Sequence, residues 1–553
     1  MINIFLLSII ATLLIAPFGV ILKRRKINST ISFQYFSEIL IYGLILISFI
    51  SLLLNFFTPL TKAINTLIFI LPFLIIYRNQ KFFFNFKFFF FLFLVSFLVS
   101  LLLIKSHAYK PDAGLYHLPY ISILNNEKII FGLSNFHFRY GHISIIQYTS
   151  AIFNNYIFST NGIVFPAALF YASIILNFIS QVKIYLENKN YNFHLFFLIS
   201  VTIYIFGKMS RYAEFGNDIP AHLLFFFLLS EILRNNLNHK LSEIRNFFLL
   251  GIFIFMNKIF LILSIIFPLI FISKNNCKKL FFNGKNLLTS IFFLMWIIKS
   301  IIVSGCVIYP IKPTCINNLS WTDINTVEIV SAEGEAWAKG WPDYIKIKSK
   351  ISHLNYNKDF NWLKTWIDFN SDRSFKILLI YSLVLIFIGL LFYKKNNNLN
   401  SLKKIHFKKI KLIILILLIG ISIWFLKSPN YRFGTGYIIG LMSILFSIII
   451  SRHSKKNLNK KIFTILIISF LIFFSKNLKR IVTVEKNYFN TPWPKYFSHS
   501  EDNIYKKPKK IMINKKKLYI TNGLCFYGLA PCSRHMVKFK VVRRFNYDFF
   551  IIK

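Results

Sequence analysis

Apolar runs of membrane-spanning length recur along this chain, and they restrict its fold more than any other feature. Inside lipid, every backbone N–H and C=O group needs a partner within the protein, so only helices and closed barrels cross a membrane. A composition with 55% hydrophobic residues does not fit a soluble globular protein. We therefore expect an all-α polytopic membrane protein with about 13–14 transmembrane helices. The expected spans lie near 3–22, 37–57, 64–77, 88–105, 162–182, 194–207, 218–234, 286–305, 376–393, 411–426, 435–451 and 462–476, with one or two more in 247–273.

The formal net charge is +46, and many of the Lys and Arg residues gather in loops between the apolar runs. A basic chain can bind nucleic acid, but basic loops between apolar spans follow the positive-inside rule of membrane proteins. We therefore expect no nucleic-acid partner, and we expect these loops to contact anionic lipid head groups. The basic loops lie at 23–26, 274–279, 394–409 and 451–461.

The alternation of spans assigns every loop to one side of the membrane. With the basic loops in the cytoplasm, the segments 106–161 and 306–375 and the tail 477–553 face outward. The sequence thus predicts a multi-pass protein of the bacterial inner membrane, with a transmembrane domain at 1–476 and a small periplasmic α+β domain at 477–553. The half-apolar stretches of 106–161 are expected to lie in the membrane interface as amphipathic helices.

The five cysteines agree with this topology. Cys306 and Cys315 share one expected outer loop, Cys525 and Cys532 share the outer tail, and Cys277 stands alone in a basic inner loop. Because disulfides form in an oxidising periplasm, we predict one disulfide within each outer pair and a free thiol at Cys277. The alternative is five unpaired structural cysteines.

The outer segment 306–375 is acidic and rich in tryptophan. It holds eight of the 20 acidic residues and five of the eight tryptophans. Tryptophans near a membrane are usually interfacial anchors, but the indole face is also a good surface for stacking a sugar. Both interpretations apply to Trp321, Trp337, Trp341, Trp362 and Trp366.

Two aspartates, Asp112 and Asp218, stand out because the first 320 residues contain no others. Asp112 lies in KPDAGLYHLPY with Tyr116 and His117, and Asp218 lies in RYAEFGNDIPAH with Arg211. Each carboxylate, at the outer end of an expected span, is a candidate general base for an acceptor hydroxyl or amine. The alternatives are a solvated loop residue for Asp112 and a helix N-cap for Asp218.

Two cations lie in or beside apolar runs. Lys258, in GIFIFMNKIF, falls midway along the run 247–273. Basic residues on both flanks of this run favour a hairpin of two short helices with Lys258 at its outer turn; a single helix would bury it near mid-membrane, at a cost of about 3 kcal/mol. Arg432, in KSPNYRFG, occupies a short outer turn, and its guanidinium fork suits a phosphate. Snorkelling to the interface is the alternative for both.

These four segments, in this order, resemble the motifs of the GT-C superfamily of membrane glycosyltransferases over residues 88–450. PDAGLYHLPY and GNDIPA resemble the acidic residues of two successive outer loops in that superfamily. GIFIFMNKIF is similar to its glycine-to-lysine stretch, with Gly251 and Lys258 aligned, and PNYRFG resembles its late Arg-Tyr or Arg-Phe turn. The chain departs from the family in having four expected helices before the acidic loop, where one is usual.

The resemblance implies a GT-C-like bundle and an inverting transfer of a sugar from a polyprenyl-phosphate donor to a glycan, lipid or protein acceptor of the cell envelope. Asp112 would deprotonate or orient the acceptor, and Asp218 is the second catalytic candidate. The candidates for binding substrate or phosphate are Tyr116, His117, Arg139, Arg211, Lys258 and Arg432.

A cofactor does not follow from the residues. Some members of the superfamily use a divalent cation such as Mg²⁺ or Mn²⁺ near the acids, and others use none. Asp218 is the candidate ligand here, but two acids without clear partners do not establish a metal site.

Two rival functions would also need cations beside apolar helices, because they handle lipid-linked sugars. A transporter or flippase for lipid-linked sugars would show inverted repeats and helices broken at the midplane, and the sequence has no clear internal symmetry. A polysaccharide polymerase would need an arginine-rich outer loop, whereas 306–375 contains only Arg373. A purely structural subunit would have no reason to place Lys258 in an apolar run.

Overall fold

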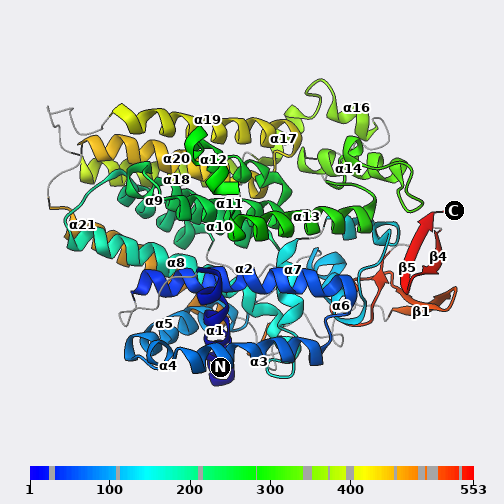
Figure 1. Cartoon of the computed structure of the whole chain (residues 1–553). Helices are drawn as coiled ribbons and strands as arrows, with labels where there is room; N and C mark the ends of the chain where they lie inside the picture. The colour runs from blue at the N-terminus through cyan, green and yellow to red at the C-terminus, as the bar shows by residue number, and fades with distance from the viewer. Residues whose placement is uncertain are drawn as a thin grey trace.

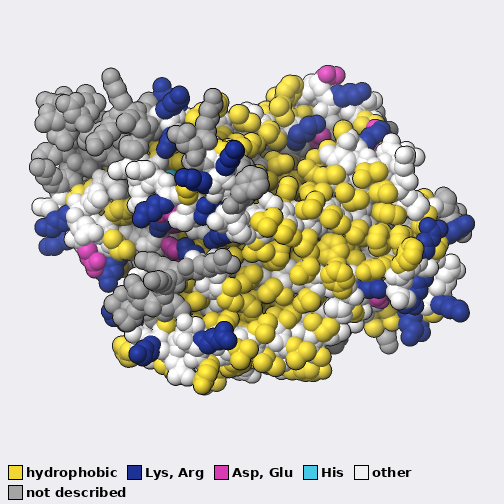
Figure 2. All heavy atoms as spheres, viewed as in Figure 1, with side chains coloured by type: hydrophobic (Ala, Val, Ile, Leu, Met, Phe, Trp, Pro, Cys, Tyr) yellow, Lys and Arg dark blue, Asp and Glu magenta, His cyan; other side chains and the backbone are white. Residues whose placement is uncertain are grey.

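The computed structural model describes residues 1–23, 32–106, 112–142, 144–209, 216–281, 283–340, 352–370, 374–393, 404–453, 457–483, 492–494, 508–534 and 539–552. In this part of the chain, eight helices are long and apolar enough to cross a membrane. Most of the long helices run along one direction (Figure 1). Figure 2 shows a broad hydrophobic face over the middle of the molecule, with Lys and Arg side chains toward both ends. The protein is therefore a multi-pass, mainly α-helical membrane protein.

Every expected span outside 247–273 coincides with a helix. Of these, α3, α9, α10 and α18 have only 16 or 17 residues, so they are shorter than the roughly 20 residues of a full crossing. The helices are α1 (Ile2–Lys23), α2 (Phe33–Phe57), α3 (Lys62–Arg78), α5 (Phe86–Leu103), α8 (Phe165–Glu187), α9 (Phe193–Lys208), α10 (Asp218–Leu233), α13 (Gly284–Ser304), α18 (Lys376–Phe392), α19 (Lys404–Lys427), α20 (Tyr431–His453) and α21 (Asn459–Thr483). Short helices α4 (Gln80–Phe83) and α12 (Lys274–Phe281) join some of them.

Small residues bring the first two helices close together. A Cβ added at Gly19 of α1 would lie 1.7 Å from the backbone oxygen of Ile39 in α2. A Cβ added at Gly43 of α2 would lie 2.4 Å from the backbone oxygen of Ile15. Such close backbone approach is how helices associate in lipid, where apolar burial alone supplies no driving force.

The run 247–273 forms a hairpin rather than one helix. The helix α11 (Leu241–Asn257) ends at Lys258, and the chain returns through two 3-10 helices, η6 (Ile259–Ile265) and η7 (Phe267–Phe271). The Ser264 hydroxyl donates a hydrogen bond to the Gly251 carbonyl, 2.7 Å away, and holds the two arms together. Lys258 therefore lies at the turn, as the basic flanks suggested.

The segment after Asp112 packs into the molecule instead of lying along the membrane interface as expected. It contains a π-helix, η1 (Ala113–His117), then α6 (Leu118–Asn126), η2 (Leu133–Asn135), η3 (Phe138–Gly141), α7 (Ile145–Ile152) and η4 (Thr160–Val164). Every residue of α7 is buried, and only one residue of α6 is exposed, so neither has a face free for lipid. Their polar groups bond inward; the Ser51 hydroxyl of α2, for example, donates to the Tyr148 carbonyl at 2.6 Å.

The second outer segment contributes α14 (Ile324–Ala338), α16 (His353–Asn357), α17 (Leu363–Asn370) and a 3-10 turn, η8 (Lys312–Thr314). Trp362 and Trp366 are buried, and the Trp366 indole N–H donates to the Pro429 carbonyl at 2.7 Å. Both act as packing residues, whereas Trp337 at the end of α14 is 38% exposed. Trp341 lies outside the described residues.

Beyond the end of α21 at Thr483, the described part of the tail contains strands and no helix. The strands β1 (Lys509–Ile513), β2 (Lys516–Ile520) and β3 (Cys532–Ser533) form one sheet, and β4 (Phe539–Arg544) pairs with β5 (Tyr547–Ile552) in an antiparallel hairpin. This tail packs on the segment after Asp112, where Phe131 and Phe549 form a β-bridge. Both expected disulfides, Cys306–Cys315 and Cys525–Cys532, form, and Cys277 is free.

Described residues of the basic segments 274–279 and 394–409 lie at one end of the bundle. Lys409 donates to the Leu237 carbonyl, just beyond α10, at 3.0 Å, and Arg245 donates to the Lys279 carbonyl at 2.8 Å. At the same end, Arg234 lies 3.1 Å from Glu231 and 3.7 Å from Glu38. Asp218 begins α10 and so lies at the opposite end, about 24 Å away along the helix axis.

Candidate functional site

Asp112 lies between two arginines. It immediately precedes the π-helix η1, and π-helical turns occur frequently at functional sites. Its Oδ1 lies 3.0 Å from Nη1 of Arg139, which η3 supplies, and its Oδ2 lies 3.5 Å from Nη1 of Arg432, at the start of α20. The carboxylate therefore has a cation at each oxygen.

Asp218 also lies between two cations. Its Oδ1 forms an ion pair with Lys258, and its Oδ2 lies 3.7 Å from Nε of Arg432. Arg432 thus connects the two aspartates, which lie in different elements. The four residues named from separate sequence motifs, Asp112, Asp218, Lys258 and Arg432, converge on one cluster.

The breaks in the helices explain this convergence. The hairpin turn after α11 places Lys258 beside the first residue of α10, and the Lys258 ammonium also donates to the Arg432 carbonyl at 3.2 Å. His222, one turn into α10, donates from Nε2 to the same carbonyl at 2.7 Å and accepts at Nδ1 from the Gly436 N–H at 3.1 Å. These bonds fix α10 and the start of α20 against each other.

Positive charge is in excess in the cluster. Among the described residues, three cations surround two carboxylates, which leaves one formal positive charge. The side chain of Lys258 is only 4% exposed, while those of Arg139 and Arg432 are 38% and 34% exposed. The two exposed guanidiniums can therefore contact a bound anion, and the buried ammonium of Lys258 can add to the positive potential at the same place.

Tyr116 and His117 line the same region. The Arg139 guanidinium lies 5.3 Å from the centre of the Tyr116 ring, in cation–π range. His117 is buried, and its Nδ1 accepts from the Gln147 side-chain amide at 2.5 Å. Burial lowers the pKa of His117 to about 4, so its imidazole is neutral at physiological pH. Burial likewise raises the pKa of the Tyr116 hydroxyl, with a further contribution from the Asp112 charge.

Aromatic rings form walls beside the cations. Phe433 lies under Lys258, with 4.4 Å from Nζ to the ring centre, and stacks on Phe260 of η6 at a centroid distance of 5.1 Å. The exposed indole of Trp337 lies 5.1 Å from the Arg432 guanidinium carbon. The site therefore combines fixed cations with apolar surface.

Sequence reasoning found the charged members of the cluster and missed two of the residues that contact the predicted site residues. Arg211 lies outside the described residues, so its position is not assigned. The partners that were missed are Gln147 and Phe433; His222 lies in the motif RYAEFGNDIPAH, and Trp337 is one of the tryptophans already considered for sugar stacking. Phe433 lies in the motif PNYRFG next to Arg432, but its contact with Lys258 depends on the folded hairpin. Gln147 gave no signal in the sequence, because its role follows from the tertiary position of α7.

The residues present do not fit a divalent cation. Among the described residues, no group of three or more His, Cys, Asp and Glu side chains could hold a metal ion. All four carboxylate oxygens of Asp112 and Asp218 face a lysine or an arginine.

Comparison with known proteins identifies a family without an activity. A family model described as "Domain of unknown function (DUF8201)" matches residues 1–439. No curated protein and no solved structure matches the chain. The matched range contains both aspartates and all three cations of the cluster.

Proposed function

The chain belongs to the DUF8201 family, whose description names no activity, and we propose from the site that it is a membrane glycosyltransferase. It would transfer a sugar from a polyprenyl-phosphate donor to a glycan, lipid or protein acceptor of the cell envelope. The observation that carries the proposal is the cluster of three cations around two carboxylates, built by residues up to 320 positions apart in the sequence.

The charges match the chemistry of such a donor. A polyprenyl phosphate carries negative charge beside a long apolar chain, and the site sets cations beside apolar helix ends and the Phe260–Phe433 stack. Arginine forks bind phosphate oxygens in pairs, and a buried lysine adds a point charge. The net positive charge of the described cluster would attract an anion such as the donor phosphate.

In the proposed reaction, Asp112 accepts the proton of an acceptor hydroxyl or amine. The freed lone pair attacks the anomeric carbon, the bond from that carbon to the phosphate oxygen breaks with inversion, and the electron pair leaves with the polyprenyl phosphate. Arg432 and Lys258 hold the departing phosphate, and Asp218 orients both cations. Arg139 orients Asp112 through their 3.0 Å contact.

The position of the helix break favours this proposal over a transporter of lipid-linked sugars. Transporters bind their substrates near the bilayer midplane, at discontinuous helices related by internal repeats. Here the break at Lys258 pairs with Asp218, the first residue of α10, and thus lies at the end of the bundle.

The test is transfer of radiolabelled sugar from a panel of polyprenyl-phosphate-linked hexoses and pentoses into membrane acceptors. Asp112→Asn keeps the size and most hydrogen bonding of the side chain, and should lower the transfer rate by about 10²–10⁴-fold, the contribution of a positioned general base. Asp359→Asn is the matched control, because it removes the same charge from an exposed turn. Wild-type transfer by Asp112→Asn would refute the proposal.

Lys258→Met separates binding from chemistry. Removal of its charge should weaken binding of polyprenyl phosphate, because the departing phosphate loses a buried cation. Lys285→Met, at the opposite end of the bundle where Lys285 donates to the Leu22 carbonyl, controls for the loss of a lysine. Equal phosphate affinities for the two variants would remove Lys258 from the donor site.

A further inference from the structure

Two disulfide-closed loops contact the chain next to Asp112 and Arg139, which form an ion pair. One is the 306–315 loop and the other is the 525–532 loop, each closed by a disulfide between its end residues. The first follows α13 directly, and the second belongs to the tail, beyond the residues that the family model matches. Both contact the immediate sequence neighbours of the ion pair.

The 306–315 loop contacts the chain around Arg139. A Cβ added at Gly141 would lie only 2.4 Å from the Tyr309 ring, so the ring lies directly on this backbone. Phe138 packs against the buried cluster that contains Tyr309 and Cys306. The residue before Arg139 and the residue two positions after it therefore both contact this loop.

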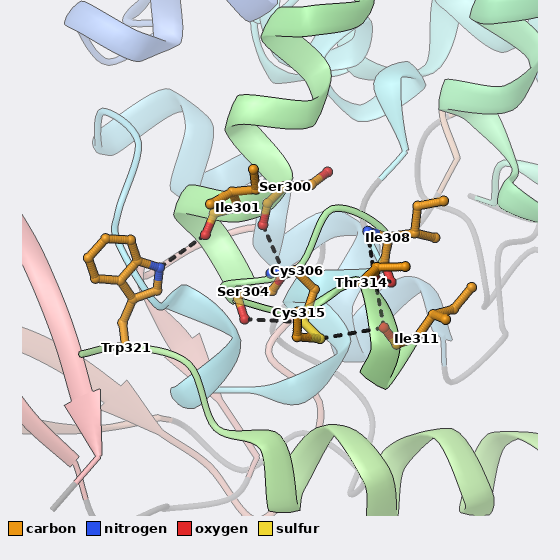
Figure 3. Close-up of a disulfide and its surroundings, with 9 residues drawn as sticks. All are labelled: Ser300, Ile301, Ser304, Cys306, Ile308, Ile311, Thr314, Cys315 and Trp321. Atoms are coloured by element: carbon orange, nitrogen blue, oxygen red, sulfur yellow. Dashed lines mark hydrogen bonds between the residues drawn. A yellow bond between two sulfur atoms is a disulfide. The ribbon is translucent and has the colours of Figure 1, made fainter. Parts of the chain in front are cut away.

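Hydrogen bonds within the 306–315 loop hold its shape. The Thr314 hydroxyl donates to the Ile311 carbonyl at 2.7 Å and accepts from the Ile308 N–H at 3.1 Å (Figure 3). The Trp321 indole N–H donates to the Ile301 carbonyl at 3.0 Å and ties the chain beyond the loop back to the end of α13. These bonds fix the shape of the loop, and the loop therefore holds the Tyr309 ring in place against the chain around Arg139.

The 525–532 loop contacts the turn that begins at Asp112. The Phe526 N–H donates to the Gly114 carbonyl at 2.9 Å, two residues after Asp112. A Cβ added at Gly114 would lie 2.9 Å from Cβ of Leu524, so the tail and the π-helix η1 approach as closely as a glycine permits.

The same loop also reaches the other half of the ion pair. The hydroxyl of Tyr140, the residue after Arg139, donates to the carbonyl of Cys532. Farther from the site, the Ser122 hydroxyl donates to the Gly528 carbonyl at 2.6 Å, and the Tyr527 hydroxyl donates to the Asn125 side chain at 3.1 Å. One loop therefore contacts both segments that carry Asp112 and Arg139.

We propose that the 306–315 and 525–532 loops are positioning elements that fix the Asp112–Arg139 ion pair, and with it the direction of the Asp112 carboxylate toward the acceptor. This inference rests on the proposed glycosyl transfer. A displacement of a reacting group by about 1 Å can lower a rate a hundredfold, so loops that only touch neighbouring backbone can control the reaction. They act through Asp112 and Arg139 and touch no substrate themselves.

The experiment asks whether the loops and Arg139 act through the same contact. Cys525→Ser/Cys532→Ser and Cys306→Ser/Cys315→Ser should each lower kcat by about tenfold to a hundredfold, with the affinity for polyprenyl phosphate within about twofold of wild type. Rates are normalised to folded, membrane-inserted protein. Arg139→Gln should lower kcat strongly in the wild-type background and by less than twofold in either disulfide-free background, because the pair is already displaced there. Cys277→Ser is the matched control for cysteine replacement.

A second variant leaves both disulfides intact, in case the serine variants do not fold. Tyr140→Phe removes only the donor to the Cys532 carbonyl, and should lower kcat without changing donor affinity. Full additivity of Arg139→Gln with loop removal, or wild-type kcat in Tyr140→Phe, would overturn the positioning role. The proposed function fails separately: it falls if Asp112→Asn transfers sugar normally, whereas the positioning role alone falls if Asp112→Asn is inactive and the loop variants keep the wild-type kcat.

Discussion

Trp337 is the exposed aromatic residue of α14 that lies against the charged cluster. Its indole is 38% exposed and lies 5.1 Å from the guanidinium carbon of Arg432, which contacts both aspartates. An indole face beside cations can stack on the apolar face of a sugar while the arginine holds the phosphate. This location favours the sugar-stacking interpretation of Trp337 over a membrane anchor.

Replacement of Trp337 tests this interpretation. Aromatic contacts contribute about 0.5–1.5 kcal/mol, so Trp337→Ala should raise the KM for the sugar donor about 2- to 12-fold, while Trp337→Phe retains most of the affinity. Phe360→Ala removes an aromatic side chain that is 52% exposed in the same outer segment and serves as control. An unchanged KM together with weaker membrane retention would instead identify Trp337 as an anchor.

His117 should make folding stability depend on pH. Burial holds the pKa of His117 at about 4, against 6.5 in the unfolded chain. The contribution of the neutral imidazole is therefore fully present above pH 6.5 and is lost as the pH falls, because the unfolded chain binds a proton that the folded chain does not.

Between pH 6.5 and 5 the free energy of unfolding of the wild type should fall by about 2 kcal/mol relative to that of His117→Gln, whose glutamine side chain does not titrate. Thermal unfolding in detergent at several pH values measures this difference. Burial also lowers the pKa of His142 to about 4. The difference in unfolding free energy between the wild type and His142→Gln should therefore change with pH in the same way, and this variant serves as a parallel case. If the difference in unfolding free energy between the wild type and His117→Gln stays constant with pH, the pKa of His117 is not lowered in the folded protein.

At the scale of elements, the hairpin 241–271 depends on Gly251. A Cβ at this position would lie 2.5 Å from the Ser264 backbone oxygen in the returning arm η6, and backbone cannot rotate away as a side chain can. Gly251→Ala should therefore displace η6 and destabilise the protein by about 1–3 kcal/mol, although alanine is the better helix former.

The control for this prediction is Gly334→Ala in α14, where an added Cβ meets nothing within 4 Å. Without a clash, helix propensity alone should stabilise that variant by up to about 1 kcal/mol. Thermal unfolding of both variants in detergent should thus give shifts of opposite sign. Because η6 begins directly after Lys258, Gly251→Ala should also weaken polyprenyl-phosphate binding; a neutral Gly251→Ala would show that the two arms can separate freely.

The elements were predictable where the signal is local. Hydropathy places the long helices, eight of which in the described part of the chain are long and apolar enough to cross a membrane, and basic flanks place the hairpin turn at Lys258, because both depend on nearby residues. The ion pairs were not predictable: Asp112 meets Arg139 across 27 positions and Arg432 across 320. The inward packing of α6 and α7 was also missed, since their buried side chains meet α2 and the tail, which no local pattern reveals.

At the scale of the molecule, the basic loops between the spans and the Asp218 cluster lie at opposite ends. The basic segments and the buried contacts of Arg234 with Glu38 and Glu231 lie at one end of α10. The Asp218 cluster, the outer segments and the tail lie at the other. The positive-inside rule then predicts that the basic end faces the cytoplasm and the cluster faces the periplasm.

A single thiol moved between the two ends tests this orientation. In the wild type, Cys277 is the one cysteine outside a disulfide, so it is the one that an impermeant maleimide can label. It lies in α12 beside the basic end, and should react in spheroplasts only after permeabilisation. Cys277→Ser/Lys517→Cys moves the thiol to the exposed side of β2 in the tail, where it should react without permeabilisation. The reverse labelling pattern would place the charged cluster on the cytoplasmic side, where a donor would have to lie in the inner leaflet. The proposed transfer on the outer face would then be wrong, even with the same residues in the site.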